Sequence, residues 1–470
     1  MRTLPRNGVG VVGVARVACG GMRGPQPLSG FPDWQPEERL VELELLDRIR
    51  ARFELHGFVP IETRAVEPVD QLLAKGETDK ELYVLRRLQA EADEDDTALG
   101  LHFDLTVPFA RYVLENRGQL QFPLRRYQMQ KSWRGERPQE GRYREFLQAD
   151  VDVVGQDTLG LHADAELLAV VGDVLASLPV PPVTMLVNNR KILEGCYRAL
   201  GIKDTQATLR TVDKLDKIGE AGVHAQLVDR LGLDQPQAEA CLRVARISSP
   251  DASFVDAVRA LGFRDELLDE GLAELAEVIG AAARLPEGRV VAALRISRGL
   301  DYYTGTVYEG VMAGHEALGA ICAGGRYDDL ASAGAGVRFP GVGISIGVTR
   351  ILGRLFGQGV LRASRRTPSC VLVALPSEED RERCDGVAAA LRARGIPCEV
   401  ADQPARYGKQ IRTAERKGIP FVWFPQGEVS GGHEVRDIRS GDQHPADPDA
   451  WTPPDEDLHV RIVTEADRSG

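Results

Sequence analysis

The sequence predicts an α+β fold, in which an antiparallel sheet is interrupted by a helical insertion and followed by a small α/β domain. Residues 124–155 alternate between polar and apolar side chains around a polar loop at 135–145, which is typical of a long antiparallel hairpin. Residues 186–287 carry amphipathic helical patterns and few strand signals. The last hundred residues alternate strand and helix patterns, which indicates a separate α/β domain.

Composition sets limits on the class of protein. The 470 residues, 43% of them hydrophobic, are enough for two to four domains, and no apolar run is long enough to predict a membrane span. A net charge of -12 gives no overall attraction for a polyanion, so any binding of nucleic acid needs local basic patches. Seven scattered cysteines without a CxxC pair argue against disulfides and thiolate zinc sites, and favour a reducing cytoplasm.

The N-terminal residues 1–27 are expected to form a disordered extension. They contain four arginines and no acid, and Arg16 interrupts a short glycine-diluted apolar stretch that resembles a targeting segment. A secretory signal is the alternative, and Met22 is a candidate start. The spacing of Gly8, Gly10 and Gly13 matches GxGxxG, but no strand precedes it, so we interpret it as a chance match.

A first helix and a short strand precede the hairpin. Apolar residues recur every four positions from about residue 36, and Gly57 supplies a stop. The strand predicted at 59–63 contains Pro60, which belongs at a sheet edge or an interface. Pro60 is therefore a candidate marker of a subunit contact.

The hairpin should have one packed face and one polar face. On its second strand Leu147, Ala149, Val151 and Val153 point one way. The opposite face carries Phe146, Gln148, Asp150 and Asp152. A solvated sheet often has such a polar face, but the aromatic ring among amides and acids favours a binding floor.

Further strands are expected at 289–310, 317–330 and 341–347, with a helix from about Thr349. The C-terminal domain should contain strands at 370–375, 399–401 and 421–424, helices at 378–394 and 407–417, and a hairpin that includes 435–438. The chain is predicted to divide into the extension 1–27, a sheet core in two parts at 28–185 and 289–358, the helical insertion 186–288 between them, and the C-terminal domain 366–470.

Three motifs contain candidate binding or catalytic residues. The first runs from Ser132 to Asp152, where Arg134 ends a strand and can clamp a phosphate while an aromatic ring stacks on a purine. Three arginines in a loop are usually a solvated surface, but their order and the strand parity favour a site. The second motif is Arg298 to Glu309. The third is the glycine-rich stretch 322–350, where missing side chains can let a ligand approach the backbone.

These motifs resemble those of class II aminoacyl-tRNA synthetases. Pro60, the Arg134 hairpin and the glycine-rich strand before Arg350 are similar to the three motifs of that class, and 298–309 and 324–330 are similar to peptides of histidyl-tRNA synthetases. The resemblance covers roughly residues 28–465. It implies a class II antiparallel-sheet core with a helical insertion and a C-terminal anticodon-binding domain.

The resemblance also implies roles for individual residues. Arg298 and Arg134 would be catalytic. Histidine would be bound by Asp104, Thr106, Arg134, Gln148, Asp152, Arg298, Tyr302, Tyr303 and Tyr327. ATP would be bound by Arg134, Glu136, Arg142, Phe146 and Arg350. Transfer RNA would contact Gln139, Arg406, Lys409 and Arg412.

Two positions depart from the family pattern. Asp152 stands where the acid that reads the imidazole is commonly glutamate, and His102-Phe103 replaces a usual Arg-Pro. Taken alone, the basic residues of 406–417 are more simply explained as a solvated helix face. Because the chain resembles a tRNA synthetase, we interpret these basic residues as a patch that contacts the tRNA anticodon.

The implied activity is attachment of histidine to its tRNA through histidyl-adenylate, with ATP as substrate, Mg²⁺ held through phosphates and no protein metal site. The partners would be histidine, ATP, tRNA and a second copy of the chain in a cytoplasmic homodimer, with no membrane. The alternative is a non-catalytic histidine-binding regulatory subunit of a biosynthetic phosphoribosyltransferase. The intact segment from Arg298 to Tyr303, both ATP arginines and the C-terminal domain argue against this alternative.

Overall fold

The computed structural model describes residues 26–73, 81–87, 98–282, 289–297, 302–328, 336–426 and 432–464. Nearly all of the predicted extension at 1–27 lies outside these ranges, and so does Arg298. Within them, no helix is long and apolar enough to cross a membrane.

A nine-stranded sheet forms the centre of the main body, in the order β1-β5-β6-β12-β11-β10-β7-β9-β8. Only the pairs β1–β5 and β7–β9 are parallel among its described strands. The strands are β1 (Val59–Pro60), β5 (Leu124–Trp133), β6 (Glu145–Val154), β7 (Val183–Asn189), β8 (Ser248–Ser249), β9 (Val290–Ala293), β10 (Thr306–Met312), β11 (Cys322–Tyr327) and β12 (Gly341–Gly347). The antiparallel core predicted from the alternating residues is confirmed.

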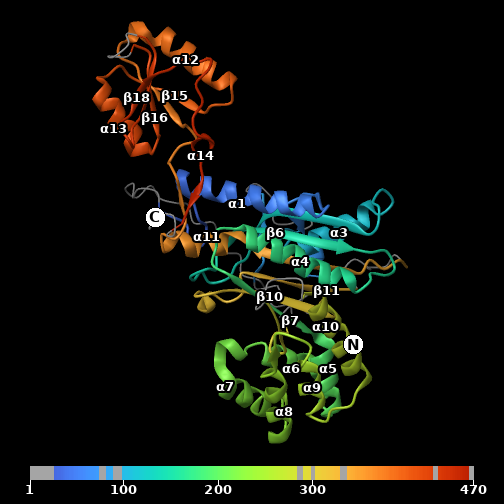
Figure 1. Cartoon of the computed structure of the whole chain (residues 1–470). Coiled ribbons are helices and arrows are strands. Elements are labelled where there is room, and N and C mark those ends of the chain that lie inside the picture. The colour runs from blue at the N-terminus through green and yellow to red at the C-terminus, as the bar shows by residue number, and fades with distance from the viewer. Residues whose placement is uncertain are drawn as a thin grey trace, which may run out of the picture.

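The predicted hairpin is formed by β5 and β6, paired from Leu124 opposite Val154 to Trp133 opposite Glu145. Its apolar face, which includes Ala149 and Val151, belongs to the main hydrophobic core. The helices α1 (Pro36–Leu55) and α4 (His162–Ser177) contribute to the same core and cover this face of the sheet (Figure 1). The polar side chains of β6 are therefore left on the opposite face.

The strand after α1 is shorter than predicted, because only Val59 and Pro60 have strand geometry. Gly57 ends the helix region with φ +79°, a conformation that suits glycine. Strand β1 lies at the edge of the sheet, so the edge position predicted for Pro60 is confirmed. The predicted subunit contact of Pro60 stays a prediction.

The region predicted as a helical insertion contains α5 (Arg190–Ala199), α6 (Thr205–Val212), α7 (Leu215–Asp229), α8 (Gln235–Ala245), α9 (Phe254–Arg259) and α10 (Glu266–Ala281). Its expected start at residue 186 falls inside β7. The insertion also shares one continuous hydrophobic core with the sheet, since Leu227 and Phe254 cluster with the apolar residues of β6. Helices α6 to α9 extend from the end of the main body remote from the C-terminal domain (Figure 1).

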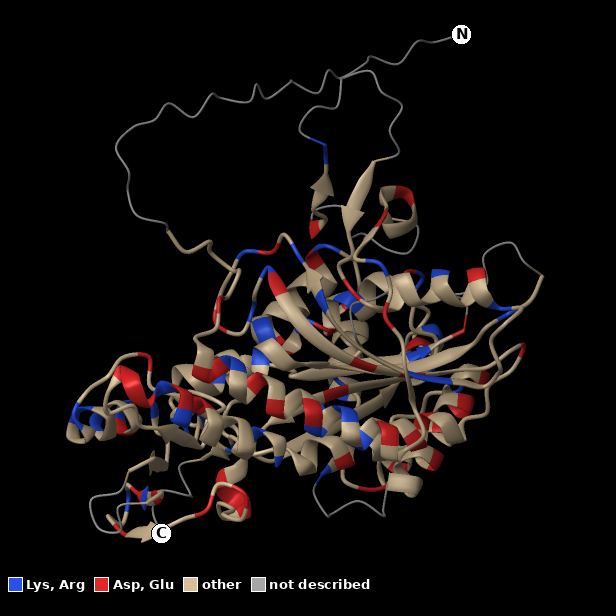
Figure 2. Ribbon diagram, turned by 90° about the horizontal axis from the view of Figure 1, so that it is seen from above, with Lys and Arg blue, Asp and Glu red and all other residues tan. Residues whose placement is uncertain are grey.

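A small sheet of β2 (Val66–Pro68), β4 (Leu99–Leu101) and β3 (Val84–Leu85) stands out from the main body (Figure 2). Helix α2 (Val69–Leu73) follows β2, and α3 (Thr106–Asn116) follows β4. Helix α11 (Val348–Gly357) begins directly after β12, close to the predicted start at Thr349.

The C-terminal domain has a five-stranded sheet in the order β15-β14-β16-β17-β18. Its elements are β14 (Val371–Val373), α12 (Arg381–Ala393), β15 (Cys398–Val400), α13 (Tyr407–Lys417), β16 (Phe421–Phe424), β17 (Glu434–Asp437), β18 (Gln443–Pro445) and α14 (Asp455–Leu458). Helices α12 and α13 contribute to separate core clusters, which places them on opposite faces of the sheet. After this domain the chain returns to pair β19 (Ile462–Val463) with β13 (Arg362–Ala363) in the linker.

Candidate active site

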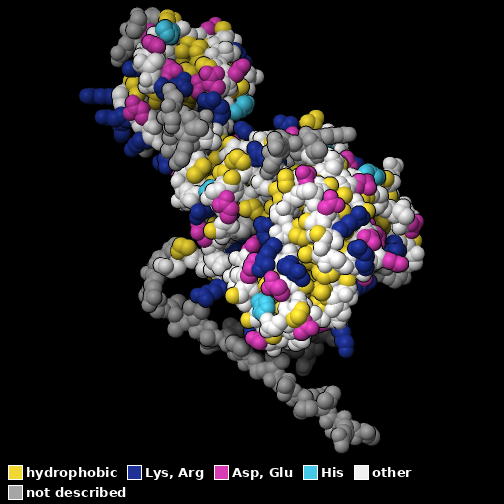
Figure 3. Space-filling view, turned by 60° about the horizontal axis from the view of Figure 1, so that its bottom comes forward, with side chains coloured by type: hydrophobic (Ala, Val, Ile, Leu, Met, Phe, Trp, Pro, Cys, Tyr) yellow, Lys and Arg dark blue, Asp and Glu magenta, His cyan; other side chains and the backbone are white. Residues whose placement is uncertain are grey.

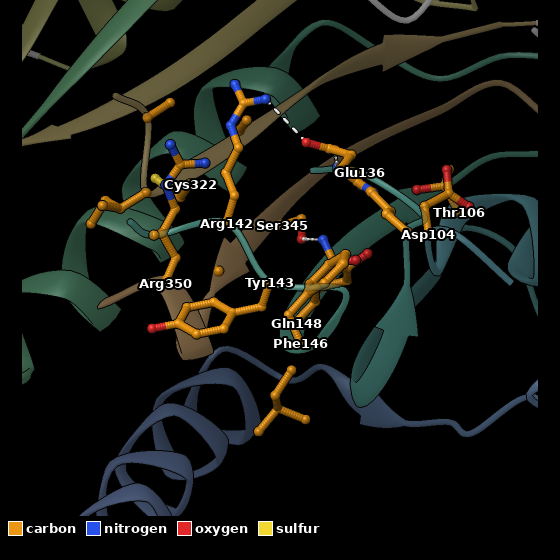
Figure 4. Close-up of a pocket in the computed structure, with 18 of the residues that line it drawn as sticks. Asp104, Thr106, Glu136, Arg142, Tyr143, Phe146, Gln148, Cys322, Ser345 and Arg350 are labelled. Atoms are coloured by element: carbon orange, nitrogen blue, oxygen red, sulfur yellow. Dashed lines mark hydrogen bonds and ion pairs between the residues drawn. The ribbon is translucent and has the colours of Figure 1, made fainter. Parts of the chain in front are cut away.

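A pocket of about 260 Å³ opens over the polar face of the sheet. The strands β6 and β12 form its floor, the loop between β5 and β6 and the start of α11 form one end, and the start of α3 lies at the other (Figure 4). The predicted residues that line it are Asp104, Thr106, Arg134, Glu136, Arg142, Phe146, Gln148, Tyr302, Tyr303 and Arg350. These residues come from segments up to 246 positions apart, so the fold brings them together.

Asp104 lies at the turn that begins α3. Its Oδ1 accepts a hydrogen bond of 3.0 Å from the backbone N–H of Val107, which fixes the carboxylate. Its Oδ2 is buried and has no hydrogen-bond partner among the described residues. Burial raises the pKa of Asp104, while the Val107 N–H and the charge of Arg134 oppose that rise. A cationic ligand group would satisfy this oxygen.

Gln148 and Asp150 occupy the middle of the floor. The side-chain amide of Gln148 donates to Ser345 Oγ on β12 at 2.5 Å, which leaves Gln148 Oε1 buried and unpaired among the described residues. Burial raises the pKa of Asp150 to about 7, against the opposing effects of Arg126 and Ser345. Asp150 is thus a lining carboxylate that the list of predicted site residues did not include.

Asp152 lies deeper and is held by its own neighbours. Its Oδ2 is 2.7 Å from Arg126 Nη2, and its Oδ1 accepts a hydrogen bond of 2.8 Å from the Tyr327 hydroxyl. Arg126 is completely buried, and its guanidinium lies 4.1 Å from the ring centroid of Phe109. Asp152 lines a small recess behind the main pocket rather than the main pocket itself.

The glycines of β12 serve a different purpose from the predicted one. A Cβ on Gly343 would lie 2.0 Å from Asp152 Oδ1, and one on Gly341 would lie 2.3 Å from the Tyr327 ring. The space that these two glycines leave is therefore filled by side chains of the protein. The prediction that they admit a ligand to the backbone is wrong at these two positions.

Three tyrosines form an aromatic wall beside the floor. The rings of Tyr302 and Tyr303 lie 4.7 Å apart edge to face, and Tyr302 lies 6.4 Å from Tyr327. A Cβ on Gly325 of β11 would be 2.6 Å from the Tyr303 ring, so this glycine makes room for the wall. Tyr302 and Tyr303 line the main pocket, while Tyr327 lines only the recess.

Three arginines line the rest of the pocket. Arg134 donates from Nε to the Phe103 carbonyl at 3.0 Å, and its guanidinium lies 5.0 Å from the centroid of Phe146. Arg142 donates to Glu136 at 3.0 Å, and Arg350 is anchored by the carbonyl of Leu318. Figure 4 shows Arg142 and Arg350 side by side in this part of the pocket. Three guanidinium groups that line one pocket suit the binding of a polyphosphate.

The predicted tRNA residues lie outside the pocket. Gln139 is exposed in the tight turn that it makes with Arg142. Arg406, Lys409 and Arg412 are exposed on and just before α13. In Figure 3 Lys and Arg side chains gather on the outer edge of the C-terminal domain, where α13 lies in Figure 1.

His102 and Phe103, the departures from the family pattern, are buried supports of the site. His102 Nε2 lies 2.7 Å from the Lys131 carbonyl, and its ring packs against Trp133. The Phe103 carbonyl accepts the hydrogen bond that orients Arg134. Strand alternation alone could not have revealed these contacts, because they join a loop to the hairpin.

The comparisons with known proteins agree with this geometry. The family model described as histidyl-tRNA synthetase matches residues 30–351, and a model described as anticodon binding domain matches residues 369–449. The chain belongs to the histidyl-tRNA synthetase family. The resemblance that the three motifs indicated is thereby confirmed, and so is the α+β fold class.

Individual relatives agree over nearly their whole length. A protein named histidine–tRNA ligase from Micrococcus luteus is 55% identical, with 94% of this chain and 99% of the relative covered. One of the same name from Cutibacterium acnes is 54% identical, with 93% and 98% covered. The crystal structure of histidyl-tRNA synthetase from Nostoc sp. PCC 7120 superposes with a TM-score of 0.79 at 35% identity, with 90% of this chain and 97% of that chain covered.

Proposed function

We propose that this chain attaches histidine to its cognate tRNA in two steps. The histidine carboxylate attacks the α-phosphorus of ATP, the bond from that phosphorus to the bridging oxygen breaks, and pyrophosphate leaves. The terminal ribose hydroxyl of the tRNA then attacks the acyl carbon, and AMP leaves. The observation that carries the proposal is one pocket whose lining joins the buried acceptors Asp104 and Gln148 to the guanidinium groups of Arg134, Arg142 and Arg350.

The acceptor end suits the amino acid. An ammonium group carries three N–H donors, and Asp104, Thr106 and Gln148 offer oxygen atoms around the same space. Tyr302 and Tyr303 supply an aromatic wall that a flat ring can pack against. We assign these five residues to histidine binding.

The basic end suits ATP. Arg134, Arg142 and Arg350 would neutralise the phosphates, and Phe146 would stack on the purine. Glu136 is the carboxylate beside these arginines, which fits a Mg²⁺ held mainly by phosphate oxygens. When bound, Mg²⁺ would offset charge on the pyrophosphate. Arg298, which lies outside the described residues, keeps the role at the reacting carboxylate that the resemblance implies.

The surface of α13 would contact tRNA. Its first turn contains no acid, and basic residues stand at Arg406 and Lys409. Cations at a helix N-terminus oppose the helix dipole, so these residues are not explained by helix stability. A polyanion would be attracted by them, and Gln139 would contact the acceptor end of the tRNA near the pocket.

A homodimer and a cytoplasmic location complete the proposal. Strand β1 is an edge strand that has no neighbour on its outer side within the described chain. Val59 in this strand is 48% exposed, and Leu55 at the end of α1 is 72% exposed. Such apolar residues at an edge suit a second copy. The six described cysteines are buried and form no disulfide with one another, as expected in a reducing compartment.

The test is histidine-dependent exchange of pyrophosphate into ATP, with all twenty amino acids compared. Histidine alone should support exchange, and Arg134→Ala should reduce its rate on the order of 100-fold, because a guanidinium at the α-phosphate acts in the transition state. Arg383→Ala, an exposed arginine on α12, is the control and should leave the rate unchanged. Histidine binding without exchange would instead favour the regulatory subunit.

A further inference from the structure

A tight turn near the start of the described chain packs against the loop between β5 and β6. The backbone N–H of Phe31 donates to the carbonyl of Leu28 at 3.1 Å, so residues 28–31 form a β-turn. Its third residue, Gly30, has φ +84°, which is typical of a type II turn and favours glycine. Among the described residues that line the main pocket, none comes from this turn.

The carbonyl of Gly30 joins the turn to the end of the loop. It accepts hydrogen bonds from the backbone N–H groups of Arg144, at 2.7 Å, and of Glu145, at 3.1 Å. A Cβ on Gly30 would lie 2.9 Å from Arg144 Cγ and 2.9 Å from Pro138 Cγ. Position 30 therefore favours glycine for two separate reasons, the backbone conformation and the closeness of the loop.

Arg144 connects the turn to residues that line the pocket. Its Nε donates to the carbonyl of Glu136 at 3.1 Å, and its own carbonyl accepts from the backbone N–H of Arg134 at 2.9 Å. The carboxylate of Glu136 in turn accepts from Arg142 at 3.0 Å. These three partners are residues that we assign to ATP, so a displacement of Arg144 would also move the side chains that bind ATP.

The turn also reaches the start of the same loop. The ring of Phe31 lies 6.1 Å from the ring of Tyr83, edge to face. Two residues before Tyr83, the carbonyl of Glu81 accepts from the backbone N–H of Gly135 at 2.7 Å. The loop is therefore held at its end by Gly30 directly, and at its start by the segment 81–83 on which Phe31 packs.

The turn contributes little to the hydrophobic core. Leu28 is 64% exposed, and none of residues 28–31 belongs to a hydrophobic cluster of the described chain. What these residues provide is contact with the loop rather than burial of apolar surface.

We propose that Gly30 and Phe31 are positioning residues for ATP, which hold the loop between β5 and β6 in the conformation that binds this substrate. They touch neither substrate and act through Arg144 and through the segment 81–83. This inference rests on the proposed function, because it concerns the part of the pocket that binds ATP.

The experiment compares Gly30→Ala with a matched control, Gly262→Ala. Gly262 lies in the turn between α9 and α10 and has φ +82°, and a Cβ there would have no described atom within 4 Å. Both variants place alanine in a left-handed conformation, so both should lower the melting temperature. Only Gly30→Ala should also displace Arg144 and Pro138.

Pyrophosphate exchange should show an effect on ATP alone. In Gly30→Ala the KM for ATP should rise about tenfold, because a small displacement of positioning groups weakens their contacts, while the KM for histidine stays within about twofold. In Gly262→Ala both KM values should stay within about twofold of wild type. Calorimetric titration with ATP alone should show the same loss of affinity in Gly30→Ala, and this measurement does not depend on the reaction.

Phe31→Ala keeps the inference testable if Gly30→Ala does not fold, because it removes a ring contact without straining the backbone. It should raise the KM for ATP about threefold and leave the KM for histidine unchanged. Phe31→Tyr keeps the ring and should behave as wild type.

The outcomes separate the two proposals. Loss of ATP affinity in Gly30→Ala and Phe31→Ala supports the inference even if wild type shows no exchange with histidine, a result that would overturn the proposed function alone. Exchange by wild type, with an unchanged KM and affinity for ATP in both variants, would overturn the inference alone. An equal rise of both KM values in Gly30→Ala, or the same effect on ATP in Gly262→Ala, would indicate a general loss of structure and would also overturn it.

Discussion

At the scale of single residues, the site is built from polar groups that the protein leaves partly unsatisfied. Arg126 and Asp152 are buried and pair with one another, which limits the cost of burying each charge. Asp104 and Asp150 instead each have one oxygen without a hydrogen-bond partner among the described residues. Such buried groups lower the stability of the folded protein, but they are already in position to bind a ligand.

The pH dependence of stability should reveal the free-energy cost of burying the Asp150 carboxylate. Burial, Asp152 and Asp104 raise its pKa to about 7, while Arg126 and Ser345 oppose the rise. In the unfolded chain an aspartate ionises near pH 4. Between about pH 4 and 7 the folded state therefore binds the extra proton, so stability falls as pH rises through this range, and the loss is complete above pH 7.

Asp150→Asn removes this titration. The variant should melt a few °C above wild type at pH 8, because at most about 4 kcal/mol of desolvation cost is relieved. At pH 5.5, midway between the two pKa values, about half of the difference should remain, because Asp150 is already ionised in the unfolded chain but still protonated in the folded state. Thermal melts of both proteins without substrate provide the measurement. An equal difference at the two pH values would show that the carboxyl group does not titrate near pH 7.

At the scale of elements, each functional segment has one apolar face that packs in a core and one face that carries polar or charged side chains. The hairpin of β5 and β6 buries Ala149 and Val151 in the main core, and this burial holds the polar face of β6 in position. Helix α13 buries Ala414 and packs Ile411 against the domain core. Its basic residues are thereby directed outward.

Charge reversal on α13 should weaken tRNA binding. Lys409→Glu with Arg412→Glu should lower affinity at least tenfold and reduce the salt slope by about two, because each residue would neutralise about one phosphate. Titrations with tRNA at several salt concentrations measure both quantities. Pyrophosphate exchange needs no tRNA and should be unchanged.

The matched control places the same charge change on α12, across the sheet from α13. Arg383→Glu with Arg392→Glu should leave the tRNA affinity and the salt slope close to those of wild type. Equal losses in both double variants would mean that α13 acts only through the net charge of the domain. No loss in the α13 variant would remove the patch from the tRNA interface.

At the scale of the whole molecule, the catalytic core and the C-terminal domain have separate hydrophobic clusters. They are joined by the linker pair β13 and β19, which brings the end of the chain back beside the main body. The helical insertion instead shares the core of the sheet. Motion of the C-terminal domain would therefore disturb fewer packed side chains than motion of the insertion.

The assembly should be a dimer. Light scattering at micromolar concentration should give twice the 51.3 kDa mass of one chain. Leu55→Glu with Val59→Glu should shift the mass to that of one chain, because both exposed residues would place charge at the proposed interface. Ile218→Glu, at an exposed apolar position of α7, should leave the dimer intact. A single-chain mass for wild type would contradict the proposal.

The sequence by itself determined the features that depend on local pattern. Strand alternation predicted the hairpin and its two faces, apolar spacing predicted α1, and the Arg134 and Arg350 motifs indicated the phosphate-binding part of the pocket. Only the tertiary structure decided that β7 crosses the expected boundary of the insertion and that Gly343 makes room for Asp152. It also decided which aspartate faces the pocket. Alternation places Asp150 and Asp152 on one face, but Asp152 is enclosed by Gly343 on β12 and by the Tyr327 hydroxyl from β11, and both strands lie far from β6 in the sequence.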